Sequence, residues 1–449
     1  MDTRIGTIAL VFFVLGLGGC DLLDVQNPNT LQESQLDNPT SSQAMASGLK
    51  GSAARGLGYQ LATYGMASDE LTWIGSRDAW QQLDFGEISN PNNEFSDLAF
   101  PYLAEANWHA SEYVRRMEAF RQEGTLPSAD ILVETYLYGA VVKTSIADVF
   151  DDYVVGADKR QGGVRVSSTD STMASFYDTA LRWVLSAQDL NSGLDEPVLQ
   201  AELKAMEARI RFSRSLWPNL QPGDGGISTG EDALVANQAA ASAAEEALSL
   251  MSGRESSYQY EMPIPASASY DSYVAGQVNN RQEMVVSDAY VSRNPDDGTF
   301  EAVTYEDPIT GDVHPYVQTV VTNRYSSSGN AAADVVVVSA REMNLIRAEV
   351  ALANGDASGF DSAINDLRAI NGFSPYDGPS ADGISRIDLL ASARQANLFF
   401  QLRRLKDLYR FGETTPFWQS GSDAMTSPGT FFPITATEIS SNPNISRLE

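Results

Sequence analysis

Residues 341–370 read REMNLIRAEVALANGDASGFDSAINDLRAI, and this stretch indicates two short helices joined by a tight turn. Apolar residues recur every three or four positions over 340–352 and again over 363–370, which is the spacing of one face of a helix. Gly355-Asp356 separates the two patterns and supplies the turn. Small residues such as Ala348 and Gly355 would let the helices approach closely, as in tetratricopeptide-like pairs.

The same helical spacing runs through most of the chain and predicts a mainly α-helical protein. Ser, Asp or Pro precede several of these segments and Gly or Pro follow them, as expected at helix starts and stops. Length alone allows one large domain or two closely packed ones. The spacing begins near Gln43 and is then found over 98–120, 131–150, 173–190, 198–216, 233–251 and 387–411.

Two long segments lack helical spacing, residues 65–101 and 258–338, and we expect them to be loop-rich insertions on the helical body. In the second segment, a strand at 299–305, a turn at 307–312 and a returning strand at 315–321 predict a small β-hairpin. Long loops in compact proteins are usually functional, so these insertions are where a ligand site is expected.

The N-terminal segment predicts a lipid anchor. Arg4 precedes an apolar run over residues 8–17, which is too short to span a bilayer and has the form of a signal peptide. Leu-Gly-Gly before Cys20 matches the lipobox of bacterial lipoproteins, in which the thiol is acylated and the chain is cut before the cysteine. We therefore expect residues 1–19 to be removed, Cys20 to carry the anchor, and residues 20–449 to form the mature domain.

The net charge of −29, from 59 acidic and 30 basic residues, limits the partners of this chain. Such an excess argues against nucleic-acid binding and against docking on anionic lipid headgroups. Salt would screen the self-repulsion, so a saline habitat and an ordinary acidic secreted protein are both compatible with the composition.

Four segments of the chain resemble the SusD/RagB family of outer-membrane nutrient-binding lipoproteins. The first is Cys-Asp-Leu-Leu-Asp-Val at residues 20–25, followed by Asn-Pro. Residues 341–349 are similar to the family's "EMYLIRAEA" helix, residues 401–412 to its "RWFDLRRWG" stretch, and residues 432–445 to its "FPIP…EI..NPN" ending. Asn344 departs from the pattern, because tyrosine is common there, and Arg-Phe replaces an arginine-tryptophan pair in the third segment.

The resemblance implies a SusD-like fold, with tetratricopeptide-like helix pairs and a loop-rich ligand face. It implies a lipid-anchored protein of the outer membrane that faces the cell exterior. Such a protein would lie over a SusC-like TonB-dependent barrel and pass an oligosaccharide, or a peptide, to it. Neither catalysis nor a cofactor follows from the family.

Trp73, Arg77, Asp78 and Trp80 are the candidate ligand-binding residues, because they concentrate aromatic and charged side chains in the first insertion. Aromatic faces can stack on sugar rings, while arginine and aspartate side chains hydrogen-bond hydroxyl groups. The alternative is that both tryptophans fill the core beneath a loop, since tryptophan is highly buried on average.

Other chemistries have weaker support in the sequence. Residues 226–230 match the Gly-x-Ser-x-Gly pattern of serine hydrolases, but that elbow needs a strand before Ser228 and a helix after it. His109 and His314 are the only histidines, so we expect no metal site. Two alternative functions follow: a tetratricopeptide-like scaffold lipoprotein that binds only proteins, and a secreted hydrolase.

Four basic residues crowd one predicted helix: Arg403, Arg404, Lys406 and Arg410. In so acidic a chain we expect them to form internal ion pairs with neighbouring helices, the alternative being a basic ligand patch.

Overall fold

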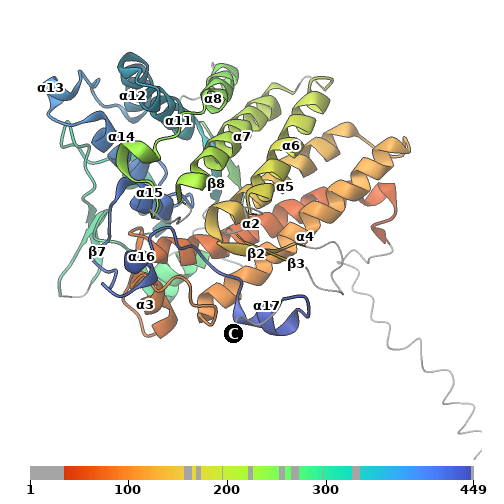
Figure 1. Cartoon of the computed structure of the whole chain (residues 1–449), viewed down its shortest axis with the longest axis horizontal. Helices are drawn as coiled ribbons and strands as arrows, with labels where there is room; N and C mark the ends of the chain where they lie inside the picture. Colours follow the sequence, from red (N-terminus) through yellow and green to blue (C-terminus); the bar gives the residue numbers. More distant parts are fainter. Residues whose placement is uncertain are drawn as a thin grey trace, which may run out of the picture.

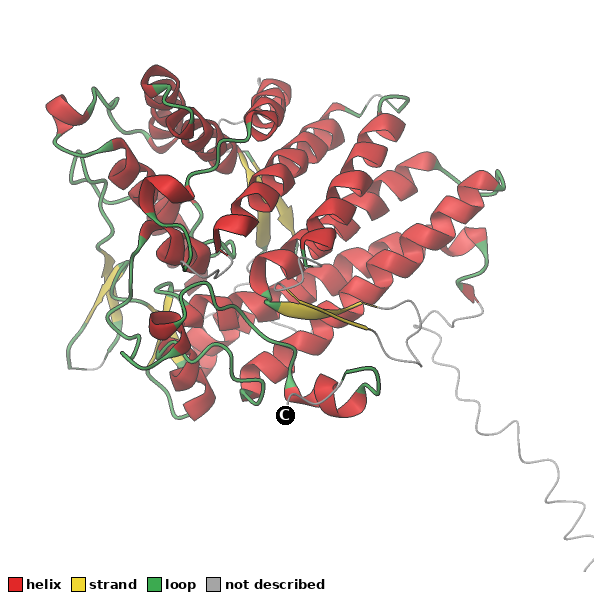
Figure 2. Cartoon of the chain, viewed as in Figure 1, coloured by secondary structure: helices red, strands yellow, loops and turns green. Residues whose placement is uncertain are grey.

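Helices dominate the computed structural model of this chain (Figures 1 and 2). The structure describes residues 35–155, 164–167, 173–194, 196–220, 226–251, 258–263, 273–296, 298–325 and 334–445. The expected signal peptide and Cys20 lie outside these residues, so the lipid anchor stays a prediction. Among the residues described, no helix is both long and apolar enough to cross a membrane.

The body of the protein is an array in which each long helix packs on the next one along the chain (Figure 1). This arrangement confirms the prediction of a mainly α fold built from paired helices. The array consists of α2 (Ser42–Ala67), α4 (Glu94–Gln122), α5 (Ala129–Val149), α6 (Ala174–Asn191), α7 (Pro197–Leu216), α8 (Gln238–Met251), α11 (Ala340–Ala353) and α12 (Ala357–Asn371). Shorter helices complete the fold: α3 (Asp78–Asp84), α9 (Tyr273–Ala275), α10 (Pro315–Val320), α13 (Pro379–Asp382), α14 (Arg386–Asn397), α15 (Arg404–Phe411), α16 (Asp423–Thr426) and α17 (Ala436–Ser441).

The turn between α11 and α12 forms as the sequence predicts. Gly355 has φ 75°, a left-handed conformation that glycine adopts without steric cost. Asp356 then caps α12, because its carboxylate accepts the backbone N–H of Gly359 at 2.9 Å. These local signals explain why this helix pair is readable from sequence alone.

One predicted helix, 387–411, is wrong as a single element. The chain forms α14 and α15 and leaves the helical path between them, where Phe400 and Leu402 have φ of 56° and 62°. The Phe400 N–H donates to Oε1 of the Glu70 side chain at 2.6 Å, so a residue far away in sequence replaces the helical hydrogen bond. Local periodicity cannot report such a contact.

The first insertion is shorter than predicted, because the neighbouring helices extend into 65–101. The Asn93 side chain accepts the N–H groups of Phe95 and Ser96 and so begins α4 before the exposed Pro101. Between α2 and α4 the chain forms the short strand β1 (Leu71–Trp73) and helix α3.

The strands form two-stranded antiparallel sheets, and the predicted hairpin partner is wrong. Strand β7 (Phe300–Val303) pairs with the preceding β6 (Val291–Arg293), whereas the expected returning strand is helix α10. Pro315 opens this helix at a position where its missing N–H leaves no hydrogen bond unmade. The remaining pairs are β1 with β5 (Met284–Val286), β2 (Asp152–Val155) with β3 (Val164–Ser167), and β4 (Gln259–Met262) with β8 (Val335–Ser339).

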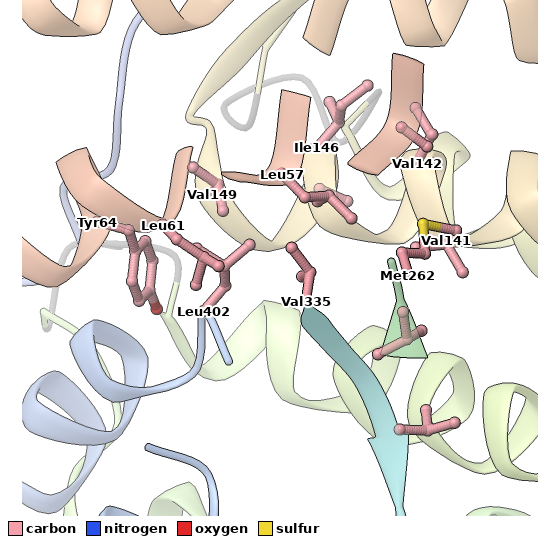
Figure 3. Packing of buried hydrophobic residues seen from close by; sticks show 14 of the residues in the cluster. Leu57, Leu61, Tyr64, Val141, Val142, Ile146, Val149, Met262, Val335 and Leu402 are labelled. Carbon is pink, nitrogen blue, oxygen red and sulfur yellow. The ribbon is translucent and has the colours of Figure 1, made fainter. Parts of the chain in front are cut away.

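The centre of the core lies where α2, α5 and the β4–β8 pair meet. Figure 3 shows Leu57 and Leu61 of α2 together with Ile146 and Val149 of α5, with Val335 of β8 close by. Every residue of β8 is buried, as expected for a strand covered on both faces.

The basic residues of the α15 segment are buried in ion pairs, which confirms the expectation of internal pairing. Two of the four pairs join this segment to α11, and the other two join it to α5 and to the α2–β1 connection. Its carboxylate partners come from the α2–β1 connection, α5 and α11, so the pairs hold α15 against the array. The pairs are Arg403 with Glu342 at 2.9 Å, Arg404 with Asp69 at 2.7 Å, Arg410 with Glu349 at 2.6 Å, and Lys406 with Asp148.

Candidate functional site

Glu283 holds the loop between β1 and α3 through both its backbone carbonyl and its side-chain carboxylate. Glu283 accepts the backbone N–H groups of Ser76 and Arg77 at 2.9 and 3.1 Å. At Gly75 a Cβ atom would lie 2.1 Å from a Glu283 carboxylate oxygen, so only glycine allows this approach. These contacts hold the loop, which carries Arg77 and joins Trp73 of β1 to Asp78 and Trp80 of α3, against the residue that precedes β5.

Trp80 belongs to the core, so the structure does not place its ring where a sugar could stack on it. Its exposed fraction is 0%, and its ring stacks on Phe95 with 3.7 Å between centroids. Trp80 lies on the inner face of α3, so its indole fills the space between α3 and α4. The alternative considered from the sequence, a core tryptophan beneath a loop, describes this residue.

The other three predicted residues lie nearer the surface. Trp73 is half-buried in β1 opposite Met284, and its backbone N–H donates to the Asp84 carboxylate at 3.0 Å. Burial raises the pKa of that carboxyl to about 7. Asp78 is exposed at the start of α3.

Arg77 lies at the edge of an aromatic region. It is half-buried, forms an ion pair with Glu94, and its guanidinium lies 5.5 Å from the centre of the Phe95 ring. The hydrogen bond to the Glu94 carboxylate raises the pKa of Arg77 above its usual value. Arg77 thus remains a cation beside the Phe95 ring. The buried Trp80 ring packs against the same phenylalanine.

Three half-buried tyrosines continue this region, and we call Tyr59, Tyr102 and Tyr273 the aromatic patch. The Tyr59 ring lies between the other two, 4.3 Å from the Tyr102 centroid and 4.2 Å from the Tyr273 centroid. Tyr273 also approaches Trp80 at 6.2 Å, which connects the patch to the predicted residues. Helices α2, α4 and α9 each contribute one ring.

A second guanidinium borders the aromatic patch. The Arg55 guanidinium lies 3.8 Å from the centre of the Tyr102 ring, close enough for a cation–π contact. Half-buried aromatic rings offer apolar faces to a sugar ring, and nearby guanidinium groups donate hydrogen bonds to hydroxyl or carbonyl oxygens. The patch therefore has the chemistry of a binding surface for a polar ligand with apolar faces.

A separate pocket of about 830 Å³ lies where β4, α10, α11 and the end of α12 meet. Its volume falls in the range of about 300 to 1,000 Å³ that is typical of small-molecule sites. None of its lining residues belongs to the aromatic patch. They are Tyr258, Gln259, Pro315, Tyr316, Thr319, Arg341, Ala369, Ile370, Asn371 and Gly372.

The described residues around Ser228 do not form the strand and helix of a serine elbow. In the described segments on its two sides the chain forms 3-10 helices, Trp217–Leu220 and Gly230–Ala233. A serine elbow requires a strand before the nucleophile and a helix after it. Within the described part of the chain, no cluster of three or more His, Cys, Asp or Glu residues could hold a metal ion.

Known proteins were compared with this chain by sequence and by structure. No protein-family model and no curated protein matches the sequence. Solved structures share its fold. A SusD superfamily protein from Bacteroides thetaiotaomicron superposes with a TM-score of 0.62 at 13% sequence identity, and the match covers 91% of this chain and 99% of that one. The chain has the SusD-like fold.

Two further structures extend the match. A SusD homolog from Bacteroides thetaiotaomicron has a TM-score of 0.62 at 13% identity and covers 93% of this chain and 98% of its own. A SusD-like carbohydrate binding protein from Bacteroides vulgatus has a TM-score of 0.57 at 11% identity, with 84% of both chains covered. The resemblance read from the four sequence segments is confirmed at the level of fold.

The sequence singles out Arg77 as a candidate but gives no sign of the three tyrosines of the aromatic patch. Its tyrosines lie in three helices that are far apart in the sequence, and each one fits an ordinary helical pattern. Partial exposure distinguishes them from core aromatic residues, and exposure depends on packing. No local sequence signal could have brought them together.

Proposed function

We propose that this protein is a surface-exposed outer-membrane lipoprotein that binds a nutrient and delivers it to a SusC-like TonB-dependent transporter. The aromatic patch carries the proposal, because its half-buried rings lie beside the Trp80–Phe95 pair that Arg77 borders. The SusD-like fold and its likeness to a carbohydrate binding protein from Bacteroides vulgatus support an oligosaccharide as the ligand.

The geometry of the patch favours a sugar over a peptide. Tyr59 and Tyr273 are stacked with an interplanar angle of 21°, which presents aromatic faces and edges rather than a deep side-chain pocket. Pyranose rings have apolar faces that pack on such surfaces, and their hydroxyl groups suit the guanidiniums of Arg55 and Arg77. A peptide could also bond these guanidiniums through its carbonyl oxygens, but its backbone lacks the apolar ring face that packs on an aromatic surface.

Calorimetric titration with a panel of neutral oligosaccharides and peptides tests the proposal. Tyr59→Ala and Tyr273→Ala should each weaken binding of the active ligand by about 1 to 3 kcal/mol, the scale of losing one large buried contact. The control is Trp217→Ala, since Trp217 is also half-buried with an arginine at 6.0 Å but lies at the end of α7. Saturable binding that survives both tyrosine variants would remove the patch from the site.

The lipid anchor and the transporter are tested on the native protein. Intact-mass analysis should find a chain that starts at an acylated Cys20; an unmodified thiol or a retained signal segment would refute the anchor. Pull-down in mild detergent should recover a large β-barrel, because a lid-like complex needs an extensive interface, commonly above about 2,000 Å². Capture of other proteins, with no binding of any small ligand, would favour the scaffold function instead.

A further inference from the structure

Arg341 forms part of the wall of the 830 Å³ pocket, at the start of α11. Its exposed fraction is 8%, so the guanidinium has lost most of its contact with water. Its Nε donates to the side-chain oxygen of Asn371 at 3.2 Å, and its guanidinium lies 4.7 Å from the centre of the Tyr316 ring. These neutral groups are its partners among the described residues.

Arg341 differs in this respect from the other buried arginines of the described chain. Each of the others forms an ion pair with a buried carboxylate, whereas Arg341 forms none with any described residue. The pairs are Arg209 with Asp148, Arg368 with Asp307, Arg394 with Asp407, Arg403 with Glu342, Arg404 with Asp69, and Arg410 with Glu349. An arginine without an acid is notable in a chain with 59 acidic and 30 basic residues.

The position of Arg341 adds to the energetic cost of its charge. A buried cation without an anion is unfavourable, because desolvation is not offset by attraction. Arg341 is also in the first turn of α11, where the helix dipole places partial positive charge. Burial accordingly lowers the pKa of Arg341. Burial, and next to it the charge of Arg341, lowers the pKa of the neighbouring His314 to about 4. An anion in the pocket would relieve this positive charge.

The pocket around Arg341 has room and further polar groups for such a ligand. Tyr258 and Tyr316 offer aromatic surface, while Gln259, Asn371 and the exposed Thr319 carry groups that can bond hydroxyls or carbonyls. A guanidinium binds a carboxylate through two parallel hydrogen bonds, a geometry that phenol and amide groups cannot provide.

We propose that this pocket is a second binding site, for a ligand that carries a carboxylate, and that Arg341 is the residue that pairs with that carboxylate. The carboxylate can come from a uronic acid unit of an acidic oligosaccharide or from the C-terminus of a short peptide. The site shares no residue with the aromatic patch, so it does not depend on the proposed function of that patch.

Calorimetry with paired probes tests the proposal and separates the two sources. The sugar pair is digalacturonate and neutral galactobiose; the peptide pair is N-acetyl-dialanine and its C-terminal amide. At least one acidic probe should bind saturably, ten times or more tightly than its neutral partner, and its affinity should fall as salt rises. Binding of neither acidic probe, or equal binding of acidic and neutral probes, would overturn the proposal.

Variants then assign the binding to the pocket. Arg341→Gln should reduce acidic-probe affinity at least tenfold without lowering the melting temperature, because it removes an uncompensated buried charge. Thr319→Trp keeps that charge but fills the pocket, and should cause a similar loss. Arg347→Gln is the matched control, since Arg347 lies on the same helix but pairs with Asp366 at 3.0 Å.

Two outcomes of the variant series would refute the assignment. One is unchanged acidic-probe affinity in Arg341→Gln; the other is an equal loss in Arg347→Gln. Tyr273→Ala should leave acidic-probe binding intact, so failure of the aromatic patch and failure of this pocket give different results.

Discussion

Replacement of Lys143 by methionine should change the pH dependence of stability in a way that the structure specifies. Lys143 lies in α5 and is buried, and its ammonium donates to the Asn107 side-chain oxygen at 2.6 Å and to Ser111 Oγ at 2.9 Å. The rings of Phe176 and Trp183 lie 5.3 and 5.6 Å away. Lys143 forms no ion pair with a described carboxylate, and burial lowers its pKa from 10.5 to about 7.

Proton linkage gives the size of the change in unfolding free energy that Lys143 causes between low and high pH. Below pH 7 Lys143 is charged in both the folded and the unfolded chain, so folding bears the full cost of burying the charge. Between pH 7 and 10.5 only the unfolded chain binds the proton, so stability rises with pH until both states are neutral. With about 1.36 kcal/mol per pKa unit, this contribution changes by about 4 kcal/mol between pH 6 and pH 10.

Lys143→Met removes this titration while keeping a long unbranched side chain. The difference in unfolding free energy, variant minus wild type, should therefore fall by about 4 kcal/mol from pH 6 to pH 10. Denaturant titrations at several pH values measure this difference in unfolding free energy. The variant also loses the hydrogen bonds to Asn107 and Ser111, but that loss is present at every pH and cancels in the comparison. Ile146→Val in the same helix is the control, with a cost of about 0.5 to 1.5 kcal/mol that does not vary with pH. A Lys143→Met difference that stays constant within about 1 kcal/mol, or grows with pH, would refute the reasoning.

Three further changes probe other buried groups. Trp80→Ala should cost about 3 to 5 kcal/mol of stability in denaturant unfolding, because it empties the space against Phe95; a cost below about 1 kcal/mol would contradict its core position. Burial raises the pKa of Glu70 to about 8, so the folded chain keeps a proton that the unfolded chain releases above pH 4.5. Wild-type stability therefore falls as the pH rises from about 4.5 to about 8. Glu70→Gln should therefore gain about 4 kcal/mol relative to wild type between pH 5 and pH 9, and a flat difference would argue for an ionised Glu70. Arg410→Met should cost about 3 to 5 kcal/mol of unfolding free energy, because it leaves the buried Glu349 carboxylate without its 2.6 Å partner. The double variant Arg410→Met with Glu349→Leu should recover part of that loss in thermal or denaturant unfolding.

The helical body could be predicted from the sequence, because its signals are local. Apolar spacing marks the long helices, and Gly355 and Asp356 set the turn between α11 and α12 through their own backbone and side-chain chemistry. The ion pairing of the basic residues in the α15 segment could also be predicted, because cations in so acidic a chain are expected to pair with carboxylates. The four segments that resemble the SusD/RagB family also indicate the fold from local sequence, because each is a short contiguous motif.

Tertiary structure alone decided the break between α14 and α15, the burial of Trp80, the aromatic patch and the isolation of Arg341. Each depends on a group that is distant in sequence: Glu70 takes the N–H of Phe400, and Phe95 covers Trp80. The sequence shows 30 basic residues against 59 acidic ones, but not that Arg341 would be buried without an ion pair to any described carboxylate. Residue type sets which contacts are possible, whereas burial and pairing are properties of the packed chain, because they depend on which surfaces the fold removes from water.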